Sequence, residues 1–250
     1  MYVLDGLEIL QGSLTLAFAL ISFILGILIL QKYFKLRDKN LLYIGITWIF
    51  LISPWWPDAI SFLLLIFSGG IINLPDPIYF FIANALIAPI FYTWAKAFTN
   101  LVISKNKKLK VVIVVGLTAW AVIFEIFFLI FYFMDYNLIG IRQAVFYVEW
   151  IDFIDINLLL ASVFFTITGL IFSGKALRSD SPEIKLKGVF LLIAFITFTI
   201  GAVFDVLFVG QYNEVTLIIA RTFVIIAAFS FYIGFILPKF IKKMILKSVN

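Results

Sequence analysis

Cysteine and histidine are both absent from this 250-residue sequence. Without cysteine, the chain has no disulfide, no thiolate nucleophile and no cysteine-ligated metal. Without histidine, it lacks the commonest general base and the commonest zinc ligand. These two absences exclude Ser–His–Asp hydrolases, zinc-dependent membrane hydrolases and haem proteins with histidine ligation.

Charged residues are also scarce, at 13% of the chain against 64% hydrophobic residues. Soluble domains usually carry about 25% charged residues and about 45–50% apolar residues. A soluble core of this length has no room for so much apolar surface. The hydrophobic side chains are therefore expected to face lipid and one another.

Apolar runs recur seven times in the sequence. Each is long enough to cross a bilayer, which requires about 20 residues. Their short connections predict that neighbouring helices are antiparallel. We therefore expect an all-α, multi-pass protein of the cell membrane, in which residues 1–250 form one seven-helix transmembrane domain. The predicted spans are about 9–31, 42–68, 78–102, 111–133, 149–173, 187–210 and 214–237.

Lysine and arginine are distributed unequally between the two sides of these spans. Sixteen of the 19 basic residues fall in four segments on one side, four in each segment. Arg142 is the single basic residue in the opposite connections. The positive-inside rule then predicts an external N-terminus and a cytoplasmic C-terminus. The sixteen are Lys32, Lys35, Arg37, Lys39, Lys105, Lys107, Lys108, Lys110, Lys175, Arg178, Lys185, Lys187, Lys239, Lys242, Lys243 and Lys247.

The net charge of +5 does not predict nucleic-acid binding, because the basic residues border the spans. At such positions they orient the chain in the lipid bilayer and contact anionic headgroups. Docking of a cytoplasmic signalling partner at the same basic segments is the alternative interpretation.

Six polar residues interrupt the predicted spans, where ionisable side chains are costly and usually face the bundle interior. At 1.5 Å per residue, all six are expected about 8 to 15 Å below the external ends of their helices. Their shared depth predicts one polar cluster that faces the outside of the cell. The six are Asp58, Asn84, Glu125, Asp155, Asp205 and Arg221.

Arg221 is interpreted as the only cation of this cluster. Arginine prefers bidentate carboxylate partners, so we expect Asp205 as its first partner, across a short hairpin, and Asp155 as its second. The remaining carboxylates then require a proton, water, or a bound small cation or amine ligand. An ion pair that only locks helix packing is an equal alternative for Asp205 and Arg221.

Three acids in the fifth span, Glu149, Asp152 and Asp155, are spaced by three and are expected along one side of a helix. They are interpreted as a negative funnel leading toward Arg221, with ordinary solvated acids as the alternative. Asp58 and Glu125 have no obvious cation near them, which favours a functional role.

The second span contains two prolines, Pro54 and Pro57, which remove backbone hydrogen bonds and predict a kink or a break. A broken helix at membrane depth must be buried or line a cavity, and such breaks often mark binding sites. Trp55 and Trp56 are therefore predicted to wall a cavity, with a simple packing kink as the alternative. The predicted ligand-binding residues are Trp55, Trp56, Asp58, Asn84, Glu125, Asp155, Asp205 and Arg221.

A seven-helix bundle with an external N-terminus is similar to the rhodopsins, but the last span, from Val215 to Leu237, has no lysine to form a Schiff base with retinal. The last third more closely resembles the seven-helix sensor region of some membrane histidine kinases. A charged stretch from Leu177 to Lys187 leads into the sixth span, and the seventh ends at Pro238 before a basic exit. The resemblance implies a topology and no binding residues. The 250 residues contain no kinase domain, so signal output would require a separate partner.

Three functions are therefore open. The first is a non-enzymatic, receptor-like membrane sensor with an external-facing polar pocket. The second is a transporter or channel for a small solute or cation, and the third is a structural subunit of a membrane complex. An enzyme is not predicted, because no ligand spacing or nucleophile arrangement is visible. No catalytic residue, metal site or cofactor is assigned.

Overall fold

Seven helical segments in the described part of the chain are long and apolar enough to cross a membrane, which confirms the predicted number. The computed structural model describes residues 2–103, 105–208 and 211–246. The segments are α1 (Gly6–Leu36), a segment broken into α2 (Lys39–Leu51) and α3 (Trp56–Ser68), a segment broken into α4 (Asp76–Asn84) and α5 (Ala88–Val102), α6 (Lys107–Met134), α7 (Asp152–Leu177), α8 (Pro182–Phe208) and α9 (Glu214–Ile236).

Several helices begin at a side chain that satisfies free backbone N–H groups of the first turn. Asp5 and Glu8 form a capping box at the start of α1. The side chain of Asn106 caps α6, and that of Asn213 caps α9. The boundaries of these helices are therefore encoded by single residues in the connections.

Two of the seven segments are broken at proline. Between α2 and α3 the chain forms a short 3₁₀ helix, η1 (Ser53–Trp55), where Pro54 and Pro57 provide no backbone donor. Between α4 and α5 the break precedes Pro89. The two breaks face each other, because the Ser53 hydroxyl donates to the Ala83 carbonyl oxygen over 3.5 Å.

A β-hairpin that the sequence analysis did not predict lies between α6 and α7. After a 3₁₀ turn, η2 (Tyr136–Leu138), strand β1 (Gly140–Ala144) pairs antiparallel with β2 (Tyr147–Trp150). The predicted start of the fifth span at residue 149 is therefore wrong, because Glu149 lies in β2. Glu149, Asp152 and Asp155 consequently do not form a stripe along one helix.

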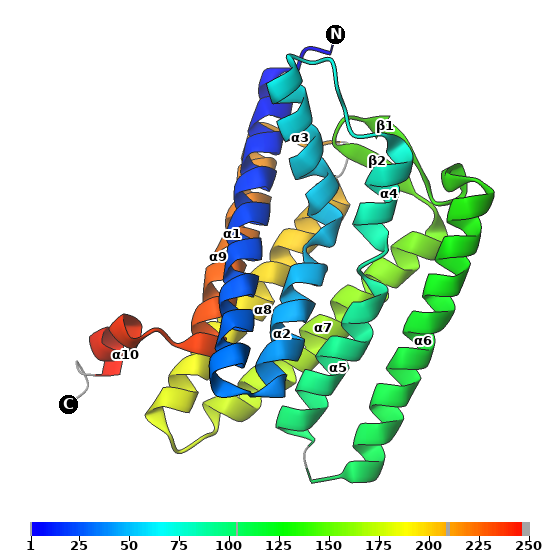
Figure 1. Ribbon diagram of the computed structural model, residues 1–250. Coiled ribbons are helices and arrows are strands. Elements are labelled where there is room, and N and C mark those ends of the chain that lie inside the picture. Colours follow the sequence, from blue (N-terminus) through cyan, green and yellow to red (C-terminus); the bar gives the residue numbers. More distant parts are fainter. Residues whose placement is uncertain (1, 104, 209–210, 247–250) are drawn as a thin grey trace.

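The bundle has two distinct ends (Figure 1). The start of α1, the α3–α4 connection and the β-hairpin lie together at one end, called here the hairpin end. The α1–α2, α5–α6 and α7–α8 connections lie at the other, called here the basic end, where α10 (Lys239–Leu246) follows α9. The four basic segments of the sequence, as far as the structure describes them, thus lie at one end of the molecule.

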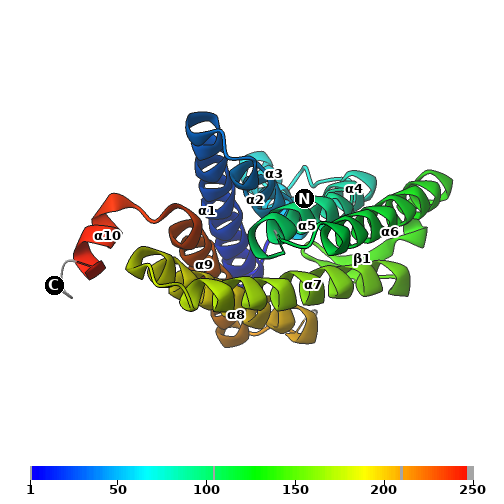
Figure 2. The same cartoon turned by 90° about the horizontal axis from the view of Figure 1, so that it is seen from below.

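Helices α8 and α9 pack side by side with α1 and α7, whereas α6 lies at the edge of the bundle (Figure 2). Large apolar side chains of α6, such as Val112, Ile123 and Phe127, are exposed along its outer face. An apolar exterior of this kind is expected of a helix that contacts lipid. The seven long apolar segments and this exterior are those expected of a multi-pass membrane protein.

Large aromatic side chains fill the centre of the bundle. Trp48 stacks on Phe231 with ring centroids 4.3 Å apart, and the indole N–H of Trp94 donates to the Thr168 hydroxyl over 2.6 Å. We call this group the aromatic layer. It consists of Trp48, Trp94, Phe165, Phe195, Phe198 and Phe231, all of them buried.

Candidate functional site

The predicted pairing of Asp205 with Arg221 is present at the hairpin end. Nη1 of Arg221 in α9 lies 2.6 Å from Oδ2 of Asp205 in α8. Nε of the same guanidinium donates to the Thr15 hydroxyl in α1 over 3.1 Å. The Arg221 side chain is 3% exposed and that of Asp205 is 17% exposed. The arginine is therefore enclosed, and the carboxylate is the member of the pair that still reaches solvent.

Asp205 accepts two further hydrogen bonds. The indole N–H of Trp55 donates to Oδ2 over 2.7 Å, and the Tyr212 hydroxyl donates to Oδ1. Burial, and then the negative charge of Asp205, raise the pKa of Tyr212, so its phenol stays protonated and acts as a donor. Three side chains, those of Arg221, Trp55 and Tyr212, thus donate to the Asp205 carboxylate.

Only one of the two predicted tryptophans contributes to this site. Trp55 belongs to η1, and the proline-induced break turns its indole toward Asp205. Trp56 is half-buried and packs edge-on against Phe23 of α1, with centroids 6.0 Å apart. The break therefore positions Trp55 as a hydrogen-bond donor to the Asp205 carboxylate and leaves Trp56 as a packing residue.

Asp58 is buried in the first turn of α3, directly after the break. Its Oδ1 accepts a hydrogen bond from the hydroxyl of Tyr79 in α4. Both Arg142 and Arg221 lie close enough to attract it electrostatically, although neither forms an ion pair with it in the described structure. The interpretation that Asp58 has no cation near it is therefore wrong.

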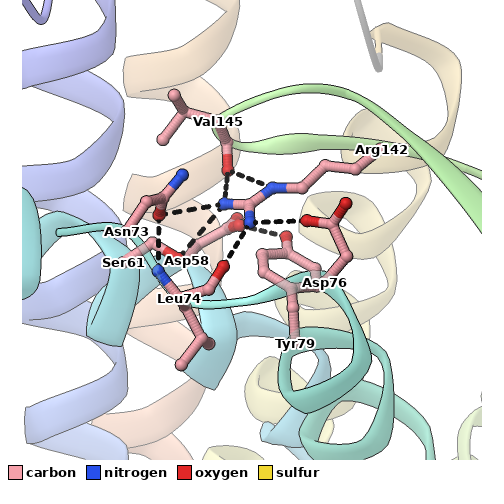
Figure 3. Close-up of polar contacts among 8 residues, drawn as sticks. All are labelled: Asp58, Ser61, Asn73, Leu74, Asp76, Tyr79, Arg142 and Val145. Carbon is pink, nitrogen blue, oxygen red and sulfur yellow. Dashed lines mark hydrogen bonds and ion pairs between the residues drawn. The ribbon is translucent and has the colours of Figure 1, made fainter. Parts of the chain in front are cut away.

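Arg142 in β1 is a second enclosed arginine at the hairpin end, with a side chain that is only 6% exposed (Figure 3). Its guanidinium donates to two backbone carbonyl oxygens. Nη1 lies 2.8 Å from the oxygen of Leu74, and Nη2 and Nε lie 2.6 and 3.2 Å from that of Val145. One side chain thus joins the β-hairpin to the α3–α4 connection.

Four side chains complete the enclosure of Arg142. Its Nη1 lies 3.2 Å from Oδ1 of Asp76, and its Nη2 donates to Ser61 over 3.2 Å and to Asn73 over 3.3 Å. The guanidinium carbon lies 4.4 Å from the centre of the Tyr79 ring, within the range of a cation–π interaction. The Tyr79 hydroxyl also donates to Asp58, so this tyrosine connects Arg142 to Asp58 (Figure 3). The residues around Arg142, Asp58 and the Asp205–Arg221 pair are called here the hairpin-end network.

Arg142 was not among the predicted site residues, and Arg221 is not the only cation of the cluster. One feature of the sequence could have identified Arg142. It is the one basic residue in the connections on its side of the predicted spans. A solitary arginine among acidic connections indicates a specific partner, and here the partners are Asp76 and two carbonyl groups.

The other three predicted residues do not join this network. Asn84 is buried at the end of α4, where its amide donates to the Phe80 carbonyl oxygen over 3.0 Å. Glu125 in α6 is half-buried, and its Oε2 has no hydrogen-bond partner in the described residues. Asp155 is exposed in the first turn of α7 and is not the second partner of Arg221. The proposed acidic funnel toward Arg221 is therefore absent from the described residues.

Charge is not balanced within the hairpin-end network. The carboxylates of Asp58, Asp76 and Asp205 face the guanidinium groups of Arg142 and Arg221. Asp76 and Asp205 are each ion-paired, so Asp58 carries the excess. A buried carboxylate of this kind is stabilised by a proton or by a bound cation.

No family model matches the chain, and no curated protein matches it.

Proposed function

We propose that the chain is an integral membrane protein with its N-terminus outside the cell and its C-terminus in the cytoplasm. The seven apolar segments and the exposed apolar face of α6 support insertion. The basic segments at one end of the bundle support the orientation. In this orientation the hairpin end faces outward.

Within that topology we infer a non-enzymatic, receptor-like sensor that binds a small cation, an amine or a proton from outside. The observation that carries this inference is the excess carboxylate of Asp58, held beside the partly accessible Asp205–Arg221 pair. A positively charged ligand balances Asp58 and competes with Arg221 for Asp205. Loss of the Asp205–Arg221 contact changes the interaction between α8 and α9.

A physical route leads from this pair toward the basic end. The Trp55 indole binds Asp205 and also packs edge-on against Phe198, with centroids 6.2 Å apart. Phe198 belongs to the aromatic layer, in which it contacts Trp48 and Phe165. A packed aromatic layer passes on a displacement of Trp55 because it is close-packed and has few alternative arrangements.

Thermal-shift measurements on the purified protein in nanodiscs test the proposal. The probes are monovalent and divalent cations, small primary amines and pH. We expect a stabilising shift with at least one probe. The shift is lost in Asp58→Asn and enlarged in Arg221→Ala, where no guanidinium competes for Asp205. Asp152→Asn is the matched control, because it removes an exposed carboxylate at the same end. The absence of any shift in the unmodified protein, or an equal shift in Asp58→Asn, would contradict the proposal.

A transporter for a small solute or cation is the second candidate, and the facing helix breaks favour it. Interrupted spans supply backbone groups to substrates at membrane depth, and here the breaks meet at Ser53 and Ala83. The aromatic layer argues against an open path, because its rings are buried and in mutual contact. Flux in proteoliposomes distinguishes the candidates: a sensor binds the cation without moving it across the bilayer.

A further inference from the structure

Helix α10 leaves the bundle sideways at the basic end, and both views of the molecule show it standing apart from the other helices (Figures 1 and 2). A defined corner sets this direction. Leu237 ends α9 in the left-handed region, with φ 44°, and its N–H bonds to the Ile233 carbonyl oxygen over 2.7 Å. Pro238 follows and stops α9 from continuing. The sideways course of α10 is therefore fixed by the backbone.

The eight residues of α10 divide into two faces at 100° per residue. Lys239, Lys242 and Lys243 lie within one third of the helix circumference. Phe240 and Met244 lie about 40° apart on the adjacent stripe of the helix and are 68% and 65% exposed. An exposed phenylalanine and methionine one turn apart form an apolar face that the bundle does not cover.

An ion pair joins the helix to the bundle. Lys242 binds Glu183, which lies in the first turn of α8 at the basic end. The helix therefore lies beside the end of the bundle that carries the basic segments (Figure 1). In the proposed topology this end faces the cytoplasmic headgroups.

We propose that α10 lies in the cytoplasmic membrane interface and binds anionic phospholipids, with Phe240 and Met244 inserted among the acyl chains and its lysines against the headgroups. Charge complementarity identifies the occupant: a short helix with an apolar face and a cationic face matches an anionic leaflet. The neighbouring basic segments contribute to the same surface. This inference rests on the proposed membrane topology and is independent of the ligand at the hairpin end.

The absence of native cysteine makes a site-specific test direct. Single nitroxide labels are placed at Phe240→Cys and Met244→Cys. The control label is at Lys239→Cys, which lies about 100° from Phe240 and about 140° from Met244 around the helix. Accessibility to oxygen and to a water-soluble nickel chelate is measured in nanodiscs of phosphatidylcholine, with and without phosphatidylglycerol. With anionic lipid we expect oxygen-accessible, chelate-protected labels at 240 and 244, and a chelate-accessible label at 239. Each lysine replaced by glutamine is expected to weaken the interfacial state by a factor of about five.

Equal chelate access at positions 244 and 239 in anionic nanodiscs would overturn the proposal. Protection that arises only when the protein concentration is raised would also overturn it, because it indicates that a second copy covers the helix. Protection that arises only on addition of a cytosolic protein would overturn it as well. A label at Phe127→Cys, on the exposed apolar face of α6, tests membrane insertion of the bundle independently of α10. If that label is chelate-accessible, the membrane topology itself is wrong and both proposals fail. If it is protected while 240 is not, only the role of α10 fails.

Discussion

Removing either member of the Asp205–Arg221 pair is expected to have unequal effects on stability. In Asp205→Asn the guanidinium stays 3% exposed without its counter-charge, and breaking a buried pair in this way costs about 3–5 kcal/mol. In Arg221→Met the carboxylate keeps Trp55 and Tyr212 as donors and reaches solvent. We therefore expect a smaller loss in that variant, of about 1–3 kcal/mol.

The double variant completes a mutant cycle. Without either charge, the penalty of an unpaired guanidinium disappears, so the two losses are not additive and a coupling of about 2–3 kcal/mol is expected. Equilibrium unfolding of the four proteins in bicelles measures it. Additive losses, or a larger loss in Arg221→Met than in Asp205→Asn, would refute the view that an enclosed arginine is stabilised by this carboxylate. A matched Asp152→Asn cycle with Arg221→Met should show no coupling, because Asp152 is exposed and does not contact Arg221.

Three further predictions follow from individual contacts. Arg142→Lys keeps the charge but removes the planar guanidinium that donates to two carbonyl groups at once. We expect the free energy of unfolding to fall by about 1–3 kcal/mol. Hydrogen exchange should become faster only in the β-hairpin and the α3–α4 connection. Glu125→Leu removes a carboxylate oxygen that is buried without a partner, so the protein should gain stability by about 1–3 kcal/mol in a thermal or denaturant titration; a loss would indicate an unrecognised partner. Gly169→Val places a Cβ 2.2 Å from the Phe195 ring, so overpacking between α7 and α8 should cost about 1–3 kcal/mol, whereas Gly174→Val on the same helix meets open space and should not.

The sequence was sufficient to predict the features that depend on composition and on single residues. Seven apolar runs predicted seven helices, Pro54 and Pro57 predicted the break, and a short connection placed Asp205 next to Arg221. Each of these follows from local physics, namely hydrophobic length, a missing backbone donor and the proximity of helices joined by few residues.

The remaining features depend on which way a side chain points, and membrane helices encode this weakly. A helix that is apolar on all sides has no stripe from which its buried face can be read. Asp155 was therefore assigned to the interior although it is exposed. The enclosure of Arg142 was invisible for another reason. Its strongest contacts are carbonyl oxygens of Leu74 and Val145, and backbone acceptors have no signature in residue type.

The contacts of Arg142 also set an order of assembly. Its partners Ser61, Asn73, Leu74 and Asp76 precede it by 66 to 81 residues, and two complete spans, the α4–α5 segment and α6, lie between. When the first three spans have been synthesised, their polar groups at the hairpin end have no guanidinium to bind. The ribosome must translate the hairpin before this end can close, so a nascent chain truncated after α5 should be a favoured substrate for membrane chaperones and proteases.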